Sequence, residues 1–350
     1  MNLNPKKPFL ILKNMVKEYL KLARSFNAVL TGVSPVMGAI AMQNYDILTL
    51  ILLFIAGFLG HTYGFVLNDI IDYKIDKSSK EISDRPLISG TITIKKAWVF
   101  AILSMLISFL IAGYIAYDTG LYFPIIMLGL SALFITIYDL ISKKLPGMDI
   151  FVALGVFFLI LYGATTAKGN IKDITNLAWI VCILGSIQVL FMQFIAGGLK
   201  DIENDYKMGA NTLAVKLRVR VLEGKLKISN SFKALAYGIQ IIDVIVVFIP
   251  FYIIPEFKKP TTFQYLQVII IIMIAILMFV ISHKLLSMKK FERGKARKYI
   301  GSHYMINFMI VPIMLMKLNP WAGILMFFPL LGFVLNNLIL HGTLLQPKTM

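Results

Sequence analysis

The chain has 350 residues, of which 58% are hydrophobic, with a mean hydropathy of +0.78 and a net charge of +17. A soluble domain is about 45–50% apolar, so this composition excludes an ordinary soluble protein and indicates an integral membrane protein. The single cysteine, Cys182, excludes a disulfide bond within the chain, and the four histidines lack the spacing of metal ligands.

Apolar segments long enough to cross a bilayer, which takes roughly 20 residues, recur along the chain. They lie near 25–43, 46–66, 97–117, 121–141, 150–167, 176–197, 235–255 and 264–286. The stretch 303–341 is also apolar, but Asn319-Pro320 interrupts it, so it forms either one span with a short segment or two spans. We therefore predict an all-α, multi-pass transmembrane bundle of nine to ten spans around a central cavity.

The basic residues are concentrated on one side of this topology. Of the 35 Lys and Arg residues, 28 lie in the N-terminal arm 1–24 and in the loops 67–96, 142–149, 198–234 and 287–302. This asymmetry places the N-terminus and these loops in the cytoplasm. The basic excess is then a topology signal and an attraction to anionic headgroups, so it argues against nucleic-acid binding.

The domain organisation follows from the same layout. We expect a basic cytoplasmic arm at 1–24 and a single transmembrane domain over 25–350. Its two halves, about 25–149 and 150–302, repeat weakly, because in each half two spans lead to an acidic cluster. The apolar segment 303–341 is additional. Two helical halves that face each other would bring the acidic clusters together over a central cavity.

The first acidic cluster reads Asn68-Asp69-Ile70-Ile71-Asp72-Tyr73-Lys74-Ile75-Asp76. Helical spacing puts Asp69, Asp72 and Asp76 on one face of a continuous helix, with Asn68 beside them. Such close carboxylates repel unless they share a cation, and Mg²⁺ is usually held by a few carboxylates together with substrate phosphates. A solvated helix end is the alternative, but three aspartates there oppose the helix dipole. We therefore predict Mg²⁺ held against a diphosphate.

The second cluster, Asp201-Ile202-Glu203-Asn204-Asp205, emerges at the equivalent place in the second half. Asp201 and Asp205 share a helical face, whereas Glu203 points elsewhere and is expected to be solvated. Lys200 precedes the cluster and is a candidate to neutralise phosphate charge. In the loop after the first cluster, Arg85 offers a planar fork of donors suited to phosphate oxygens, although a headgroup-facing arginine is an equal alternative.

Together these residues resemble the UbiA superfamily of intramembrane polyprenyltransferases. The first acidic cluster matches that family's first motif, Arg85-Pro86-Leu87-x-Ser89-Gly90 matches the segment after it, and Asp201-x-Glu203-x-Asp205-Tyr206-Lys207 matches the second motif. Tyr138 with Lys143 or Lys144 is similar to the Tyr and Lys of the family's next loop, and Arg24-x-x-Asn27 is similar to its first polar pair. The resemblance covers about residues 20–290 and implies a UbiA-like fold.

The resemblance implies Mg²⁺-dependent transfer of a polyprenyl group from an isoprenyl diphosphate to a small acceptor in the membrane. Asp69, Asp72 and Asp76, with Asn68, would hold one Mg²⁺, and Asp201 and Asp205 a second. The implied substrate-binding residues are Arg24, Asn27, Asn68, Arg85, Tyr138, Lys143, Lys144 and Lys200. Departures from the family pattern are Ser25, Asp149 and Gly198, and two acids within spans, Asp139 and Asp243, have no assigned role.

The acceptor is open between two classes, with an aromatic quinone precursor slightly favoured. The spacing to Arg85 favours an aromatic quinone precursor, whereas Arg24-x-x-Asn27 favours geranylgeranylglyceryl phosphate, the acceptor in archaeal ether-lipid synthesis. A non-catalytic isoprenoid-binding protein is a further alternative. A transporter is another, but transporters place their charged sites near the middle of the bilayer, and here the acids lie at span ends.

Overall fold

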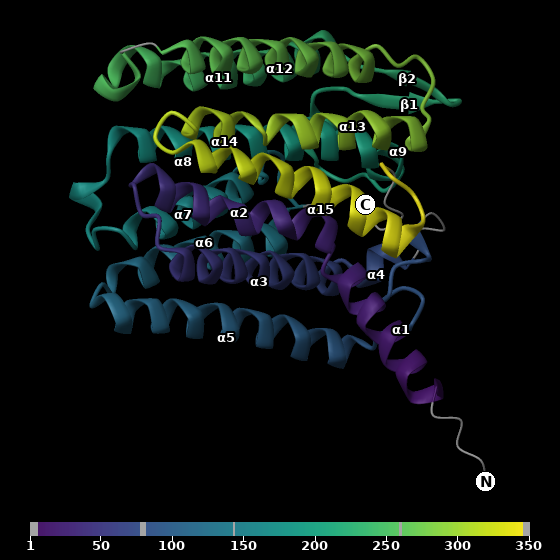
Figure 1. Ribbon diagram of the computed structural model, residues 1–350. Coiled ribbons are helices and arrows are strands. Elements are labelled where there is room, and N and C mark those ends of the chain that lie inside the picture. The colour runs from purple at the N-terminus through teal and green to yellow at the C-terminus, as the bar shows by residue number, and fades with distance from the viewer. Residues whose placement is uncertain (1–5, 78–81, 143, 259–260, 346–350) are drawn as a thin grey trace.

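The computed structural model describes residues 6–77, 82–142, 144–258 and 261–345, and almost every described segment is helical (Figure 1). The first half contains α1 (Lys6–Leu22), α2 (Ser25–Ala41), α3 (Ile47–Ile71), α4 (Tyr73–Asp76), α5 (Ile94–Thr119) and α6 (Phe123–Ile141). The second contains α7 (Ile150–Thr165), α8 (Asn176–Leu190), α9 (Gly198–Lys207), α10 (Leu213–Lys216), α11 (Asn230–Ile253) and α12 (Thr262–Leu286). The predicted all-α architecture is confirmed.

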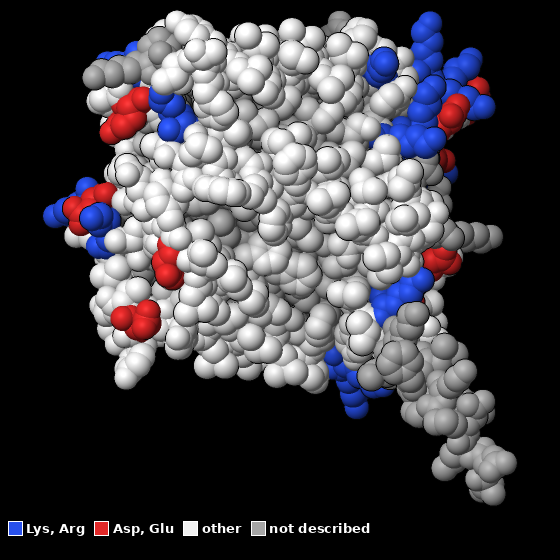
Figure 2. Space-filling view, viewed as in Figure 1, with Lys and Arg blue, Asp and Glu red and all other residues white. Residues whose placement is uncertain are grey.

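Seven of the described helical segments are long and apolar enough to cross a membrane. They are α3, α5, α6, α11, α12, the continuous segment Asn176–Lys207, and Pro320–His341. The shorter apolar helices α2 and α7 complete the set of predicted spans in these halves. Figure 2 shows a broad uncharged belt between two ends that carry the Lys, Arg, Asp and Glu residues. This distribution is that of an integral membrane protein.

The two halves meet where α2 packs on α7. Gly38 of α2 and Gly163 of α7 lie at the point of closest approach, because a Cβ atom on Gly38 would overlap the backbone of Ile160, and one on Gly163 the backbone of Pro35. Small residues allow such close approach of helices within a bilayer. The contact fixes the first half of the chain against the second and so positions the two acidic motifs.

The C-terminal segment forms two helical arms, of which only the second, Pro320–His341, is among the described helical segments long and apolar enough to cross a membrane. The first arm is α13 (Arg293–Asn307) with α14 (Ile310–Leu315), and the second is a 3₁₀ turn, η5 (Pro320–Met326), with α15 (Phe327–His341). The chain reverses between them at the interruption predicted from Asn319-Pro320. The expected boundary between 302 and 303 falls inside α13, so α13 belongs to both predicted segments.

Helix α15 returns along α2, beside the start of the chain's transmembrane part (Figure 1). The hydroxyl of Ser25 donates to the amide oxygen of Asn336 at 3.0 Å. Phe333 is fully buried and packs edge-on against Phe26, with ring centroids 5.7 Å apart, and against Tyr304 at 5.3 Å. The second arm, with α15, therefore belongs to the core of the bundle.

Two local features were not predicted. A π-helical segment, η3 (Phe191–Gly197), separates α8 from α9; such segments commonly occur at functional sites. In the loop 208–229, β1 (Arg220–Leu222) pairs antiparallel with β2 (Lys225–Lys227). The Leu226 N–H donates to the Lys289 carbonyl, which joins this hairpin to the segment that leads into α13. The loop after the second acidic motif thereby contacts the segment that precedes α13.

Candidate active site

A cavity of about 340 Å³ lies inside the bundle and is lined by both halves of the chain. At its polar end the first motif contributes Asp72, Asp76 and Asn68, and the second contributes Asp201 and Asp205. The α2–α7 contact brings these segments together although more than a hundred residues separate them. The two acidic motifs therefore face one shared space.

The first motif departs from the continuous helix that was expected. Helix α3 ends at Ile71, Asp72 is its C-cap, and the short helix α4 follows. The spacing is nevertheless kept, because the Asp72 N–H donates to the Asn68 carbonyl and the Asp76 N–H to the Asp72 carbonyl, each at 2.9 Å. Asp69, Asp72 and Asp76 are all buried. Three buried carboxylates on adjacent turns require nearby positive charge.

Two arginines supply that charge. Arg24 Nη2 lies 2.6 Å from Asp69 Oδ1, and Arg85 Nη1 lies 2.5 Å from Asp76 Oδ2 and 3.5 Å from Asp69 Oδ1. Arg24 adopts a left-handed backbone conformation, with φ 45°, at the start of α2. This conformation is uncommon for a residue with a side chain, and it turns the guanidinium toward Asp69 and over the ring of Phe65. The junction of α1 and α2 thus aims a cation at the first motif.

Arg85 also connects the two motifs electrostatically. Burial opposes its charge, but the carboxylates of Asp69, Asp76, Asp201 and Asp72 outweigh this and raise the pKa of the guanidinium above its ordinary value. One of these four acids comes from the second motif. Arg85 therefore stays charged and interacts electrostatically with carboxylates from both halves of the chain.

The second motif is held in a similar way. Asp201 Oδ2 lies 3.2 Å from Lys200 Nζ, and Asp201 Oδ1 lies 2.9 Å from Arg293 Nη2. Glu203 points away, as expected, and pairs with the exposed Lys207 at 2.8 Å. Lys200 and Arg293 both line the cavity. Arg293 begins α13 and was not among the residues selected from the sequence, because it lies in a basic loop where topology alone accounts for positive charge.

The remaining selected residues divide into two groups. Arg24, Asn27, Arg85 and Tyr138 line the cavity with the acids. Lys144 does not: it is exposed in the turn after α6, where its N–H donates to the Ile141 carbonyl and the chain leaves the helix. Lys143 lies outside the described residues.

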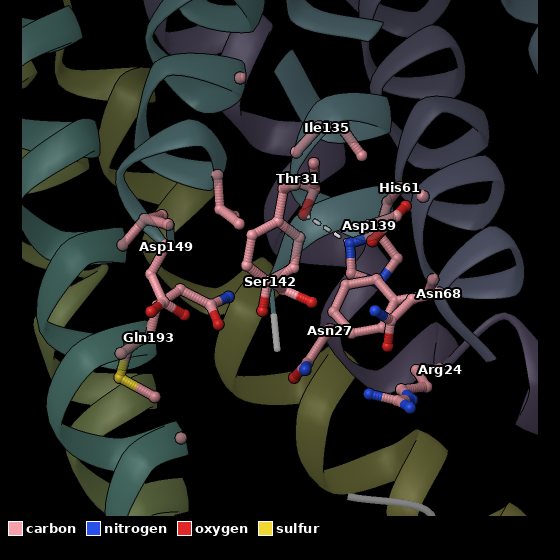
Figure 3. Close-up of a pocket in the computed structure, with 18 of the residues that line it drawn as sticks. Arg24, Asn27, Thr31, His61, Asn68, Ile135, Asp139, Ser142, Asp149 and Gln193 are labelled. Atoms are coloured by element: carbon pink, nitrogen blue, oxygen red, sulfur yellow. Dashed lines mark hydrogen bonds between the residues drawn. The ribbon is translucent and has the colours of Figure 1, made fainter. Parts of the chain in front are cut away.

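Polar side chains within the spans extend the site inward, as Figure 3 shows. Thr31 Oγ1 and His61 Nδ1 lie 2.8 Å apart in hydrogen-bond contact. Asn68 also contacts the carboxylate of Asp139, whose Oδ2 has no hydrogen-bond partner among the described residues. The sequence marked Asp139 as an acid within a span. Polar lining residues that it did not mark include Thr31, Tyr63, Ser142, Gln193, Arg293 and Tyr304.

Asp149 occupies a position at which the family pattern led us to expect asparagine. It lies just before α7 and lines the cavity. Burial raises its pKa above the ordinary value, against hydrogen bonds from its own backbone and from Tyr138 that lower it. The Tyr138 hydroxyl is thus directed along the cavity wall by Asp149.

Away from the acids the cavity becomes apolar. Its inner wall is formed by side chains of α5, α6 and α7, chiefly Met105, Phe109, Leu128, Ile135 and Leu159. Such a space excludes water and suits a hydrocarbon chain. The cavity thus joins a charged end to a hydrocarbon-like interior, which matches an amphiphile with an anionic head.

The carboxylates form a suitable but not preassembled metal site. Among the residues that the structure describes, no three His, Cys, Asp or Glu side chains lie close enough together to hold a metal ion. Instead Asp69, Asp76 and Asp201 are paired with cations. Oxygen donors of this kind suit a hard divalent cation, and Mg²⁺ completes its coordination with water and phosphate oxygens. The donor set therefore fits a hard divalent cation such as Mg²⁺.

The amino-acid sequence is similar to those of known prenyltransferases. The UbiA prenyltransferase family model matches residues 28–306. The digeranylgeranylglyceryl phosphate synthase of Pyrococcus abyssi is 30% identical over 233 residues, 64% of this chain and 79% of the relative. The protein of the same name from Pyrococcus horikoshii is 28% identical over the same shares of both chains.

Solved structures show the same fold. A UbiA homologue from Aeropyrum pernix K1 superposes with a TM-score of 0.64 at 14% identity, over 83% of this chain and 96% of that one. A UbiA homologue from Archaeoglobus fulgidus, bound to GPP and Mg²⁺, gives 0.59 at 15% identity, over 86% and 99%. With a family match across most of its length, this chain belongs to the UbiA prenyltransferase family and is a UbiA-type prenyltransferase of the membrane.

Proposed function

We propose that the protein transfers a polyprenyl group from an isoprenyl diphosphate to geranylgeranylglyceryl phosphate, with Mg²⁺ as the metal. The acceptor is supported by the names of the relatives above, which are digeranylgeranylglyceryl phosphate synthases. This evidence favours the alternative that Arg24-x-x-Asn27 indicated over the aromatic acceptor that the Arg85 spacing favoured. The chemistry itself rests on one observation: two acidic motifs and four cations line a single cavity with an apolar interior.

The donor would bind with its diphosphate between the motifs and its hydrocarbon chain along α5, α6 and α7. Asp69, Asp72 and Asp76, with Asn68, are the proposed metal ligands of the first half, and Asp201 and Asp205 those of the second. When bound, Mg²⁺ would neutralise the charge that grows on the leaving diphosphate. The neighbouring Arg85 and Lys200 would contact the diphosphate oxygens directly.

In the transfer, the bond between C1 of the allylic chain and the diphosphate oxygen breaks. A hydroxyl oxygen of the glyceryl phosphate forms the new ether bond to C1, its proton leaves, and diphosphate is released. The apolar wall keeps water from the electron-poor C1 atom, which would otherwise be hydrolysed. Tyr138, whose hydroxyl is hydrogen-bonded to Asp149, lines the cavity, and its ring would stabilise positive charge there.

The orientation of the site in the membrane follows from the charge asymmetry. We propose that the acidic motifs open to the cytoplasm, because the arm 1–24 and the loops around both motifs hold most of the Lys and Arg residues. A diphosphate donor made by soluble enzymes would then enter from the side where it is produced.

The test uses the purified full-length protein in detergent or vesicles. Geranylgeranyl diphosphate and Mg²⁺ are supplied with either geranylgeranylglyceryl phosphate or 4-hydroxybenzoate, and products are identified by mass spectrometry. We expect a prenylated glyceryl phosphate. Product with only the aromatic acid would overturn the acceptor, and product with neither would overturn both acceptor assignments.

Substitutions separate the motifs from general folding. Asp72→Asn and Asp205→Asn should abolish Mg²⁺-dependent transfer while expression is preserved. Glu203→Gln is the matched control, because Glu203 lies in the same helix as Asp205 but pairs with the exposed Lys207. Unchanged turnover in both Asp variants would contradict the proposed metal site.

A further inference from the structure

Arg293 is a cavity-lining cation without a role in the proposed function. It is the first residue of α13, in the C-terminal part of the chain, and only 14% of its side chain is exposed. Its guanidinium reaches across to the second motif, where Nη2 lies 2.9 Å from Asp201 Oδ1. A long, flexible cation buried at the polar end of a substrate cavity is expensive to keep unless its charge is used.

The charges around Asp201 show how Arg293 would be used. Asp201 contacts both Lys200 and Arg293, so two cations share one carboxylate. The charges of Arg24, Arg85 and Arg293 all act on the Lys200 ammonium, so the four cations are close enough to interact. If a metal ion takes up the Asp201 carboxylate, Lys200 and Arg293 lose this shared counter-charge. Phosphate oxygens are then their natural partners.

The reaction brings two separate anionic groups to the cavity, the donor diphosphate and the acceptor phosphate. Arg85 follows the first motif and Lys200 precedes the second, and the diphosphate is proposed to bind between these motifs. Arg293 comes instead from α13, whose Ile300 and Tyr304 also line the cavity.

Helix α13 also contacts α2. The Tyr304 hydroxyl donates to the Asn27 carbonyl at 3.2 Å, and Asn27 lines the cavity. Elements α2 and α13 thus contribute to the cavity lining with side chains other than the apolar α5, α6 and α7 residues that would hold the donor's hydrocarbon chain. An acceptor bound along α2 and α13 would leave these α5, α6 and α7 side chains to the donor.

We propose that Arg293 binds the phosphate group of the acceptor and so selects a phosphorylated acceptor over a neutral one. This inference rests on the proposed function. The planar guanidinium matches a phosphate group with two parallel hydrogen bonds, which a lysine does not reproduce. Arg293 is thus a specificity-determining residue contributed by α13, in the first of the two C-terminal arms.

The test compares geranylgeranylglyceryl phosphate with the same lipid lacking its phosphate, in wild-type protein and in Arg293→Gln. In the wild type, loss of the phosphate should lower kcat/KM by at least about tenfold, as expected for loss of a charge-assisted contact. In Arg293→Gln this penalty should shrink to within about threefold, with the donor KM changed by less than about threefold. Arg293→Lys should recover part of the preference.

Lys295→Gln is the control, because it removes one positive charge from the same helical turn at an exposed position. It should leave the acceptor preference unchanged. If Arg293→Gln does not fold, Arg293→Lys carries the test: it should raise the acceptor KM and leave the donor KM unaltered.

Two results distinguish the inference from the proposed function. If the wild type prenylates neither glycerol lipid, the proposed function fails and the inference fails with it. If the wild type prenylates the phosphorylated lipid but the phosphate penalty is equally large in Arg293→Gln, or if the donor KM rises instead, only the inference is overturned.

Discussion

The substitution Arg85→Gln tests whether the Arg85 guanidinium and the metal ion neutralise the negative charge of the same carboxylates. Arg85 contacts Asp76 and Asp69, and only 10% of its side chain is exposed, so solvent screens these pairs little. Removing one partner of a buried ion pair costs about 3–5 kcal/mol. In metal-free buffer the variant should therefore unfold at a markedly lower temperature than the wild type.

Mg²⁺ should recover much of this loss. A ligand at a hundred times its dissociation constant stabilises the folded state by about 2.7 kcal/mol, which is close to the lower bound of the cost. In the wild type Mg²⁺ must displace the guanidinium from the carboxylates, whereas in the variant it meets no such competitor. The increase in the unfolding midpoint temperature on adding Mg²⁺ should therefore be larger for Arg85→Gln than for the wild type.

The assay is thermal unfolding of the detergent-solubilised protein, followed by intrinsic fluorescence in EDTA and in excess Mg²⁺. Lys95→Gln, at an exposed position at the start of α5, controls for the loss of one positive charge. Equal gains with Mg²⁺ in Arg85→Gln and the wild type would refute the reasoning. So would an Arg85→Gln variant that is as stable as the wild type in EDTA.

Three further predictions concern the bundle and its cavity. Gly163→Ala should reduce the yield of folded protein, because overpacking against α2 costs about 1–3 kcal/mol; Gly113→Ala, which faces open space, should not. Leu159→Trp should narrow the apolar interior, so that in competition a geranyl donor gains over a geranylgeranyl donor, as product masses would show. Tyr304→Phe removes the hydrogen bond to Asn27 and should lower stability by about 0.5–1.5 kcal/mol, measured by thermal unfolding; an unchanged midpoint would contradict this.

The helices were predictable because bilayer thickness dictates the length of an apolar segment. The segment expected at 264–286 forms α12 (Thr262–Leu286), and the one expected at 97–117 forms α5 (Ile94–Thr119). The reversal at Asn319-Pro320 followed from the loss of a backbone donor at proline. The family was predictable because Asn68–Asp76, Arg85–Gly90 and Asp201–Lys207 resemble the motifs of the UbiA superfamily at matching places in the topology.

The rest depended on contacts between distant segments. Arg293 carries the same charge as its neighbours in a basic loop, and only the fold shows that it reaches Asp201. Lys144 had the right residue type but lies in a turn that leads it away from the cavity. The break at Asp72 and the π-helical segment are backbone events that side-chain periodicity does not encode.

The pairing of α2 with α15 bears on how the molecule is made. Among the described helices, α2 is synthesised before α3 to α14, whereas α15 is synthesised after them. Until α15 is inserted, the flank of α2 that receives Phe333 and Asn336 is left to lipid or to the translocation machinery. In the nascent polypeptide, the face of α2 that packs on α15 therefore stays uncovered until α15 is made. A bulky fusion that delays insertion of α15 should impair folding more than the same fusion at the N-terminus.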